Sequence, residues 1–342
     1  MFSAAENSLY GTLCLLSAIS ALVPLPVQLR ARNVGVVIMI GWTFVGIFNR
    51  GINALAFNQS LELSSVVGCD ISAILERVWQ LGLCCGCLSV LQSLERIASL
   101  RQAHLTHSDR RRQILFDLCI GLGLPLVQIP LFYIVQPHRL DLIESIGCSA
   151  PVYNSVPALF VYYLWRILIS TFCAIYATLI LRWFVLRRHQ FSAALSSHHS
   201  GLSQRKYFRL FFLAVCEATL VFAGQLFVMV RNLQINKLLP YVSWAYVHAD
   251  YNRVDHIPMA YIPQEEISTL DALRWLALTP GFTIFAIFGF SEDAKAFYSA
   301  SIKRIPGLLH CWKKSQTSFN LEPIEPSKDE IIVVVHKESV VD

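Results

Sequence analysis

Residues 68–94 read GCDISAILERVWQLGLCCGCLSVLQSL, a mostly apolar run that carries an acidic and a basic side chain, Glu76 and Arg77. As a helix rising about 1.5 Å per residue, the segment Ile71–Leu94 would extend roughly 36 Å, which is enough to cross the hydrocarbon core of a bilayer. Cys69 stands at one end of this segment, and a cluster of arginines follows the other end. We interpret it as a central transmembrane helix with a ligand side near Cys69.

The composition of the whole chain indicates an integral membrane protein. Of its 342 residues, 55% are hydrophobic and only 15% are charged, whereas soluble domains average about 25% charged residues. The mean hydropathy is +0.51, and the apolar residues gather in blocks about as long as one membrane helix. We therefore predict an all-α, seven-transmembrane helix bundle, with spans at about 8–28, 34–57, 71–94, 114–135, 157–185, 207–230 and 270–290.

The positions of lysine and arginine predict the orientation of this bundle. Basic residues gather in the first, third and fifth connections and beyond the seventh span, while the opposite connections hold few. Because cytoplasmic loops carry the excess of Lys and Arg, we expect the N-terminus outside and the C-terminus in the cytoplasm. No basic residue precedes the first apolar block, so we expect a retained span rather than a cleaved signal peptide.

The pattern of the sequence also predicts how the chain is divided. We expect a seven-transmembrane domain over residues 1–305 and a disordered cytoplasmic tail over 306–342. Within the domain, residues 291–305 have apolar positions at helical spacing, which predicts an amphipathic helix on the inner leaflet. The long outer connection 231–269 is rich in Trp and Tyr, which indicates a packed lid over the outer mouth; a loosely ordered loop is the alternative.

Several polar or ionisable side chains fall inside the predicted spans, where contact with lipid is costly. Counted along the helices, most of the ionisable ones lie in the outer half, whereas Glu217 lies deeper. We therefore predict a polar pocket open to the outside, lined by a candidate ligand-binding set: Arg50, Asn53, Glu76, Arg77, Arg166 and Arg274. In the alternative, structural interpretation, Glu76 pairs with Arg50 or Arg166 and holds helices together.

The chain carries none of the sequence motifs of common hydrolases or nucleotide-binding enzymes. There is no G-x-S-x-G, no H-E-x-x-H and no P-loop. The histidines lie mostly in predicted loops rather than at metal-ligand spacing. We therefore expect no catalytic activity, no metal site and no cofactor.

Four residues are candidates for covalent modification. Of the ten cysteines, Cys69 and Cys148 lie beside predicted outer loops, on the oxidising face of the membrane. We predict a disulfide between them, the alternative being two free thiols near the interface. Asn58 begins a glycosylation sequon in an outer loop, close to a helix end that limits access, and Cys311 in the basic tail is a candidate palmitoylation site.

Several short sequences, taken together in their order and spacing, resemble one known family. They are QLRARN (28–33), NRGINA (49–54), GCDI (68–71), LERIAS (94–99), VQPHR (135–139), IGC (146–148), RRHQF (187–191), GLSQRKYFR (201–209) and FGF (288–290). From the first span to about residue 303, the chain resembles the fungal a-factor-type mating pheromone receptors. These are the lipopeptide-sensing class D G-protein-coupled receptors.

The resemblance implies a multi-pass receptor of the plasma membrane for a short farnesylated peptide pheromone, coupled to a heterotrimeric G protein and a mating-response cascade. The lipid bilayer is then a partner and a second copy of the chain a candidate one, whereas nucleic acid is not. Basic residues at the cytoplasmic helix ends would form a G-protein-coupling set: Arg96, Arg110, Arg111, Arg112, Arg187, Arg188, Arg205, Lys206 and Arg209. Attraction to anionic lipid is the alternative explanation for these charges.

Two further observations bear on this interpretation. The sixth span has no proline over residues 211–230, where the family pattern leads us to expect one, so the movement of that helix on activation is an open question. The alternative function is a seven-helix small-solute transporter. Such transporters are built from internal repeats, and no repeat relates the first three spans to the last three.

Overall fold

The computed structural model describes residues 2–63, 65–99, 107–186, 204–235, 237–291 and 294–299. By its internal contacts the chain divides into two units, Met1–Lys295 and Ala296–Asp342. The first unit contains the helix bundle, and residues 296–299 of the second are helical. The predictions for Arg187, Arg188 and Cys311, the predicted helix beyond residue 299 and the tail 306–342 lie outside the described residues.

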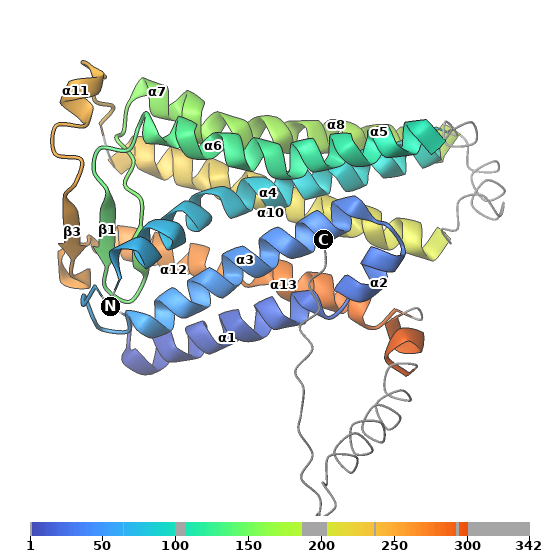
Figure 1. Ribbon diagram of the computed structural model, residues 1–342, viewed down its shortest axis with the longest axis horizontal. Coiled ribbons are helices and arrows are strands. Elements are labelled where there is room, and N and C mark those ends of the chain that lie inside the picture. Colours follow the sequence, from blue (N-terminus) through green and yellow to red (C-terminus); the bar gives the residue numbers. More distant parts are fainter. Residues whose placement is uncertain are drawn as a thin grey trace, which may run out of the picture. The chain divides into compact units, whose positions relative to one another are not determined.

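In the part of the chain that the structure describes, seven helices are long and apolar enough to cross a membrane, which confirms the predicted helical class (Figure 1). They run over Ala4–Arg30, Val34–Ala56, Val66–Ala98, Ser108–Tyr133, Val156–Leu186, Arg205–Ile235 and Gln264–Gly289. Each overlaps one predicted span. The seventh begins earlier than predicted, because Glu265 and Glu266 lie in its first turn, where acidic side chains stabilise a helix N-terminus.

Some of these long helices are assembled from shorter segments. The helical segments that form them are α1 (Ala4–Leu22), α2 (Leu25–Arg30), α3 (Val34–Ala56), α4 (Val66–Ala98), α5 (His107–Leu118), α6 (Leu124–Tyr133), α7 (Val156–Ala158), α8 (Leu164–Leu186), α10 (Gln204–Ile235), α12 (Gln264–Leu276) and α13 (Thr279–Ile284). The π-helical turns Cys119–Gly123 and Leu159–Tyr163 join α5 to α6 and α7 to α8. A third, Phe285–Gly289, ends the seventh helix.

The seventh helix is interrupted between α12 and α13, whereas α10 runs without a break. The interruption at residues 277–278 comes just before Pro280, whose ring nitrogen has no hydrogen to continue the helical ladder. The sixth span lacks such a proline and is accordingly one continuous helix. The natural point of bending therefore lies in the seventh helix.

Helix α4 is the central helix of the bundle. It begins at Ser65, whose hydroxyl accepts a hydrogen bond from a first-turn backbone N–H at 3.2 Å. Of its most apolar window, 72% is buried, against 22–50% for the other six spans. It packs closely on α3 because Trp79 lies on Gly46 and Trp42 lies on Gly82, where any larger side chain would overlap the indole rings. This contact determines which faces of α3 and α4 meet.

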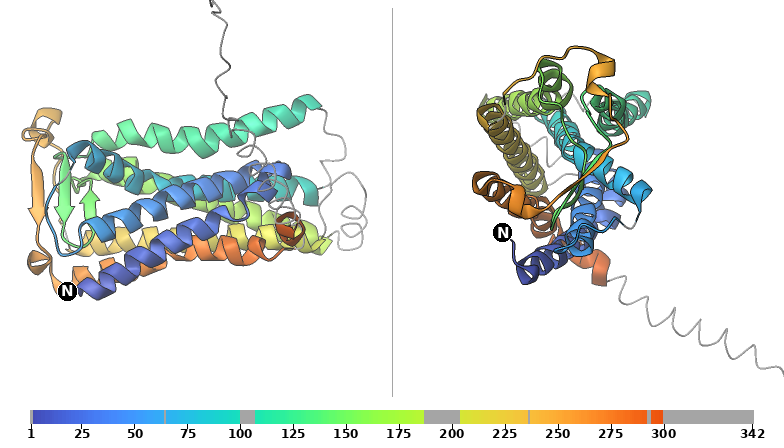
Figure 2. Two further views of the ribbon diagram at one scale, coloured as in Figure 1. Left: turned by 60° about the horizontal axis from the view of Figure 1, so that its bottom comes forward. Right: turned by 90° about the vertical axis from the view of Figure 1, so that its left-hand side faces the viewer.

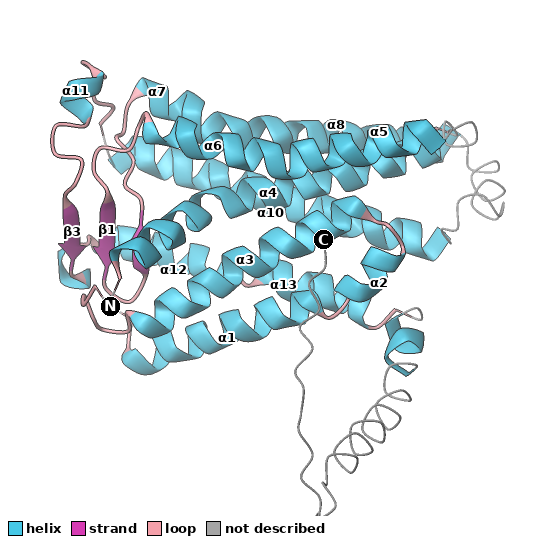
Figure 3. Cartoon of the chain, viewed as in Figure 1, coloured by secondary structure: helices cyan, strands magenta, loops and turns pink. Residues whose placement is uncertain are grey.

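A three-stranded sheet crosses the end of the bundle that also holds the N-terminus (Figure 2, Figure 3). Strand β1 (Leu140–Ile143) pairs antiparallel with β2 (Gly147–Ser149) and parallel with β3 (Val254–Ile257). These strands were not predicted, because an alternating pattern cannot be recognised over three or four residues. β3 and the short helix α11 (Trp244–Val247) belong to the connection predicted as a lid. β3 pairs with β1 as a strand of the sheet, as expected for a packed lid.

Candidate functional site

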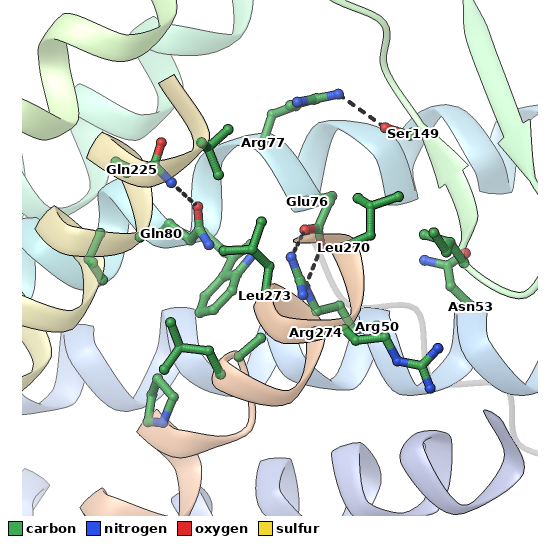
Figure 4. Close-up of a pocket in the computed structure, with 18 of the residues that line it drawn as sticks. Arg50, Asn53, Glu76, Arg77, Gln80, Ser149, Gln225, Leu270, Leu273 and Arg274 are labelled. Atoms are coloured by element: carbon green, nitrogen blue, oxygen red, sulfur yellow. Dashed lines mark hydrogen bonds and ion pairs between the residues drawn. The ribbon is translucent and has the colours of Figure 1, made fainter. Parts of the chain in front are cut away.

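A cavity of about 300 Å³ lies among α1, α3, α4, α10, α12 and α13, with residues of the β1–β2 hairpin in its wall (Figure 4). Most of the predicted pocket residues line it: Arg50, Asn53, Glu76, Arg77 and Arg274. They come from α3, α4 and α12, so the fold brings together side chains that are far apart in the sequence. The arrangement of their charges decides what the cavity can bind.

Arg50 and Glu76 form an ion pair between α3 and α4. The Arg50 Nε donates to Glu76 Oε2 at 3.1 Å, and Nη2 donates to Oε1. This two-pronged geometry is the strongest form of a carboxylate–guanidinium contact. Of the two partners considered for Glu76, the structure selects Arg50. The two charges cancel, so this pair by itself gives the cavity no net charge.

Arg274 is a buried cation in the cavity wall. Its side chain is 6% exposed, and its guanidinium carbon lies 3.9 Å from the ring centre of Phe2 and 4.2 Å from that of Tyr10. The nearest carboxylate, Asp271, is 3.7 Å from Nε, too far for a hydrogen bond. Within the described residues, Nε, Nη1 and Nη2 of Arg274 all lack a hydrogen-bond acceptor. A buried donor group in this condition is costly unless a ligand supplies the acceptor.

Arg77 and Arg166 are held by neutral groups. Arg77 donates to the Tyr162 hydroxyl at 3.1 Å, to Ser149 Oγ at 3.0 Å and to a backbone carbonyl of the hairpin. Arg166 is fully buried, donates to the Arg77 carbonyl and to Gln225 Oε1, and lies 4.3 Å from the Tyr162 ring centre. Arg166 therefore lies behind the cavity wall, and its predicted direct contact with ligand is not supported. It holds Arg77 in place instead.

Glu217 lies deeper in the cavity wall, as its position in the sixth span indicated. It is fully buried and accepts a hydrogen bond from the Thr283 hydroxyl of α13. In the described chain its second oxygen, Oε2, has no hydrogen-bond partner. Glu217 thus connects the sixth and seventh helices through one side-chain hydrogen bond near the cavity floor.

The sequence analysis did not assign three residues that shape the cavity: Tyr10, Trp79 and Gln225. Gln225 donates to Gln80 Oε1 at 2.8 Å and so joins α10 to α4. Its polarity inside an apolar span was a usable signal. Tyr10 and Trp79 carried no such signal, because aromatic residues are common in membrane spans and only packing shows that these two face inward.

A disulfide joins Cys69 at the start of α4 to Cys148 in β2, with the two Cα atoms 5.3 Å apart. Gly147, next to it, has φ of +99°, and a Cβ there would overlap the Asn53 side chain. The hairpin is therefore held against α3 and α4 at two adjacent points. Because hairpin residues form part of the cavity wall, the disulfide also positions that wall.

Replacing Cys148 by serine is expected to lower the thermal stability of the purified protein by several degrees. The disulfide closes a loop of 79 residues, which in the chain-entropy model corresponds to at most about 4.5 kcal/mol. Reduction should lower the melting temperature of the wild type and leave that of the variant unchanged. Cys119→Ser, which removes an exposed free thiol, is the control. Equal stability of both variants would contradict the prediction.

The three-stranded sheet carries a cluster of charges that was not predicted from the sequence. Ligand atoms of His138, Asp141 and Asp255 lie within 4.8 Å of one another. Arg253 donates to His138 Nδ1 at 3.2 Å and to Asp255 at 2.9 Å, so a cation is already part of the cluster. Burial raises the pKa of Asp141, and its hydrogen bond with His138 partly offsets this. We interpret the cluster as a polar network that joins β1 to β3.

The remaining predicted site residues lie at the two ends of the bundle. The Asn58 amide nitrogen donates to the Ala4 carbonyl at 3.1 Å and to Ser8 Oγ at 3.0 Å, so both of its hydrogens are engaged, which argues against glycosylation there. The described members of the predicted G-protein-coupling set lie at the end of α4 and the starts of α5 and α10: Arg96, Arg110, Arg111, Arg112, Arg205, Lys206 and Arg209. These helix ends lie opposite the sheet (Figure 1).

Comparison with known proteins identifies similar chains. The profile of the STE3 family, described as "Pheromone A receptor", matches residues 9–306. "Pheromone receptor 2" of Mycosarcoma maydis is 53% identical over the full length of both chains. "Pheromone B alpha 3 receptor" of Schizophyllum commune is 34% identical over 86% of this chain and 47% of that protein. "Pheromone a factor receptor" of Saccharomyces cerevisiae is 24% identical over 88% and 63%, respectively.

Proposed function

The chain belongs to the STE3 family of pheromone A receptors, and on this premise we propose that it binds a farnesylated peptide pheromone and activates a heterotrimeric G protein. The seven apolar helices agree with a multi-pass membrane receptor. The matched family consists of receptors, which agrees with the expected lack of catalytic activity and disfavours the small-solute transporter.

The proposed orientation has the sheet outside the cell and the basic helix ends in the cytoplasm, at the plasma membrane. Two features support it. A disulfide is kept in an oxidising compartment, and Cys69–Cys148 lies at the sheet end. Basic residues gather at the opposite end, as expected for cytoplasmic loops. In this orientation the part of the cavity wall that the β1–β2 hairpin forms lies on the side from which a secreted peptide arrives.

The observation that carries the proposed ligand site is the unsatisfied guanidinium of Arg274 in the wall of the central cavity. Arg50 is balanced by Glu76, and Arg77 already has several neutral acceptors. Arg274 is thus the cation best placed to bind a carbonyl or carboxylate oxygen of the peptide. A charge-assisted hydrogen bond of this kind contributes about 1.5–3 kcal/mol.

We propose that the signal crosses the bundle through the seventh helix. A ligand shifts the equilibrium between two conformations only if it binds one of them better. Arg274 is on α12, and Thr283, the partner of Glu217, is on α13, beyond the interruption at residues 277–278. A ligand that binds Arg274 and displaces α12 therefore changes the angle between α12 and α13 at this interruption. The change in angle weakens the Thr283–Glu217 hydrogen bond between α13 and α10. The basic cytoplasmic ends of α4, α5 and α10 would then receive the G protein.

Replacing Thr283 by valine is expected to raise signalling in the absence of pheromone by about two- to tenfold. The change removes the hydrogen bond to Glu217 that holds α13 against α10, and one such bond is worth about 0.5–1.5 kcal/mol. Thr219→Val is the matched control, because the exposed Thr219 hydroxyl bonds to the Val215 carbonyl of its own helix, α10, at 2.7 Å. Basal output of a G-protein reporter, corrected for surface receptor, measures the effect. Unchanged basal output would argue against the seventh helix as the switch.

The test of the proposed function is a reporter assay in cells that express the chain with a matching G protein. A panel of synthetic peptides should include pairs that differ only in a farnesyl group on the C-terminal cysteine. We expect no response without peptide and a response to at least one peptide of the panel. The farnesylated form of that peptide should give a much stronger response than the unfarnesylated form. A receptor that reaches the surface but responds equally to both forms would contradict the lipopeptide ligand.

A further inference from the structure

A second cavity, of about 530 Å³, lies between α4 and α6 in the outer part of the bundle. Its walls include Ala73, Ile74 and Val78 of α4 and Ile129 and Phe132 of α6. These side chains have no hydrogen-bonding groups, so transferring an apolar group from water into this space is favourable. The central cavity, by contrast, has the buried cation Arg274 in its wall.

This second cavity adjoins the lipid-facing surface of the bundle. Ile74, which lines it, is 39% exposed, and Ile71, one turn before it on α4, is 55% exposed. In a transmembrane bundle such residues face hydrocarbon. A chain dissolved in the outer leaflet can therefore enter between α4 and α6 without leaving an apolar environment.

Arg77 lies at the boundary between the two cavities and lines both. Its guanidinium donates to Ser149 in the wall of the central cavity and to the Ala150 carbonyl in the wall of the second. It also lies 5.4 Å from the ring centre of Phe132. A ligand with a polar part and an apolar part can thus occupy both spaces, with the junction beside Arg77.

The second cavity also contains an unsatisfied hydrogen-bond acceptor. Gln128 is 2% exposed, and its Nε2 donates to the Tyr162 carbonyl at 3.4 Å. Its Oε1 is buried without a donor among the residues that the structure describes. The backbone N–H of the amino acid that carries an apolar chain would satisfy this acceptor, whereas neither an isoprenoid nor a phospholipid tail has a donor of its own. At the outer rim, Asp70 and Arg139 neutralise each other through bonds of 2.6–3.2 Å.

We propose that this second cavity binds the isoprenoid chain of the pheromone, while the peptide part occupies the central cavity. The inference rests on the proposed function, since it needs a prenylated ligand. It adds a second site, a route of entry from the outer leaflet between α4 and α6, and a role for Arg77 at the junction of lipid and peptide.

The first test fills the cavity. Ile74→Trp places an indole in the second cavity, and Ile71→Trp, one turn away on α4 at a residue 55% exposed, is the matched control. With the most potent farnesylated peptide of the panel, we expect I74W to raise the half-maximal concentration about tenfold or more. This is the loss expected if as few as two CH₂ groups leave apolar contact. The response to the unprenylated form should change less than about twofold, and I71W should change neither.

The second test uses the wild-type chain and needs no substitution. A peptide whose terminal isoprene carries a diazirine is photo-crosslinked to the receptor in membranes. We expect label in residues 66–98 and 124–133, removed by excess unmodified farnesylated peptide. Label confined to α10, α12 or α13 would overturn the assignment. A diazirine phospholipid that labels the same residues, unaffected by the peptide, would identify a bilayer-lipid site instead.

The two proposals fail in different ways. If the wild type responds equally to farnesylated and unprenylated peptides, the proposal of a lipopeptide ligand is wrong, and so is the proposed isoprenoid site. If the wild type prefers the farnesylated form but I74W and I71W shift the response equally, only the location is wrong. Should I74W not reach the surface, the crosslinking of the wild type decides.

Discussion

Replacing Arg274 by methionine is expected to raise the pheromone concentration for half-maximal response by about ten- to hundredfold. The guanidinium is buried in the cavity wall and, in the described structure, has no hydrogen-bond acceptor of its own. Losing one charge-assisted hydrogen bond to the ligand costs about 1.5–3 kcal/mol, and each 1.4 kcal/mol is about a factor of ten in affinity. Methionine keeps the apolar stem, so packing against Phe2 and Tyr10 is largely retained.

The same substitution is expected to increase the stability of the detergent-solubilised receptor. Burying a guanidinium without hydrogen-bond acceptors costs several kcal/mol, whereas its cation–π contacts and the 3.7 Å ion pair with Asp271 return about 2 kcal/mol or somewhat more. Arg231→Met is the control, because Arg231 pairs with the exposed Glu265 at 3.5 Å and such surface pairs contribute little. Reporter dose–response curves and thermal unfolding measure the two effects. A variant with full potency, or one that is less stable than wild type, would refute the role assigned to Arg274.

Removing either partner of the Arg50–Glu76 pair is expected to abolish most of the receptor at the cell surface. Each single change, Arg50→Met or Glu76→Met, leaves one charge inside the bundle without its partner, which costs about 3–5 kcal/mol. That loss is a large fraction of the stability of a typical protein. The double variant leaves no charge behind and should recover most of the surface level, since a buried ion pair is often no better than two apolar residues.

The double variant also decides between the two interpretations of Glu76. If Glu76 only holds α3 to α4, the rescued receptor should respond to pheromone within about threefold of wild type. If Glu76 contacts ligand, the receptor should reach the surface and fail to respond. The Arg231–Glu265 pair is the control: Arg231→Met or Glu265→Met alone should leave the amount of receptor at the cell surface almost unchanged. If the double variant does not recover the surface level, the two side chains stabilise the receptor by more than neutralising each other's charge.

The transmembrane spans could be predicted because membrane insertion is a local property. A helix satisfies all of its own backbone hydrogen bonds, so about twenty apolar residues in a row suffice to identify it. The breaks inside spans were harder to see. The interruption at residues 277–278 has a local cause in Pro280, whereas the π-helical turns have no comparable sequence signal. The strands of the three-stranded sheet, each three or four residues long, depend on partners elsewhere in the chain.

The pocket residues were predictable by type but not by role. An ionisable side chain in a span must turn away from lipid, which holds for Arg50, Arg77 and Arg166 alike. Yet Arg166 lies behind the wall and holds Arg77, while Arg50 is neutralised by Glu76. Those differences depend on how far each helix is rotated about its axis. Rotation is set by contacts such as Trp79 on Gly46, which join residues distant in the sequence.

Hydropathy, charge placement and short motifs were therefore enough to establish the seven helices and the receptor family, since each of these signals is carried by neighbouring residues. Only the packed bundle shows that Arg274, within the described residues, is a buried cation without a hydrogen-bond acceptor and that a second cavity, between α4 and α6, adjoins Arg77. The reason is physical. Whether a buried charge is satisfied depends on the atoms within about 3 Å of it, and those atoms come from helices that meet only in the folded chain.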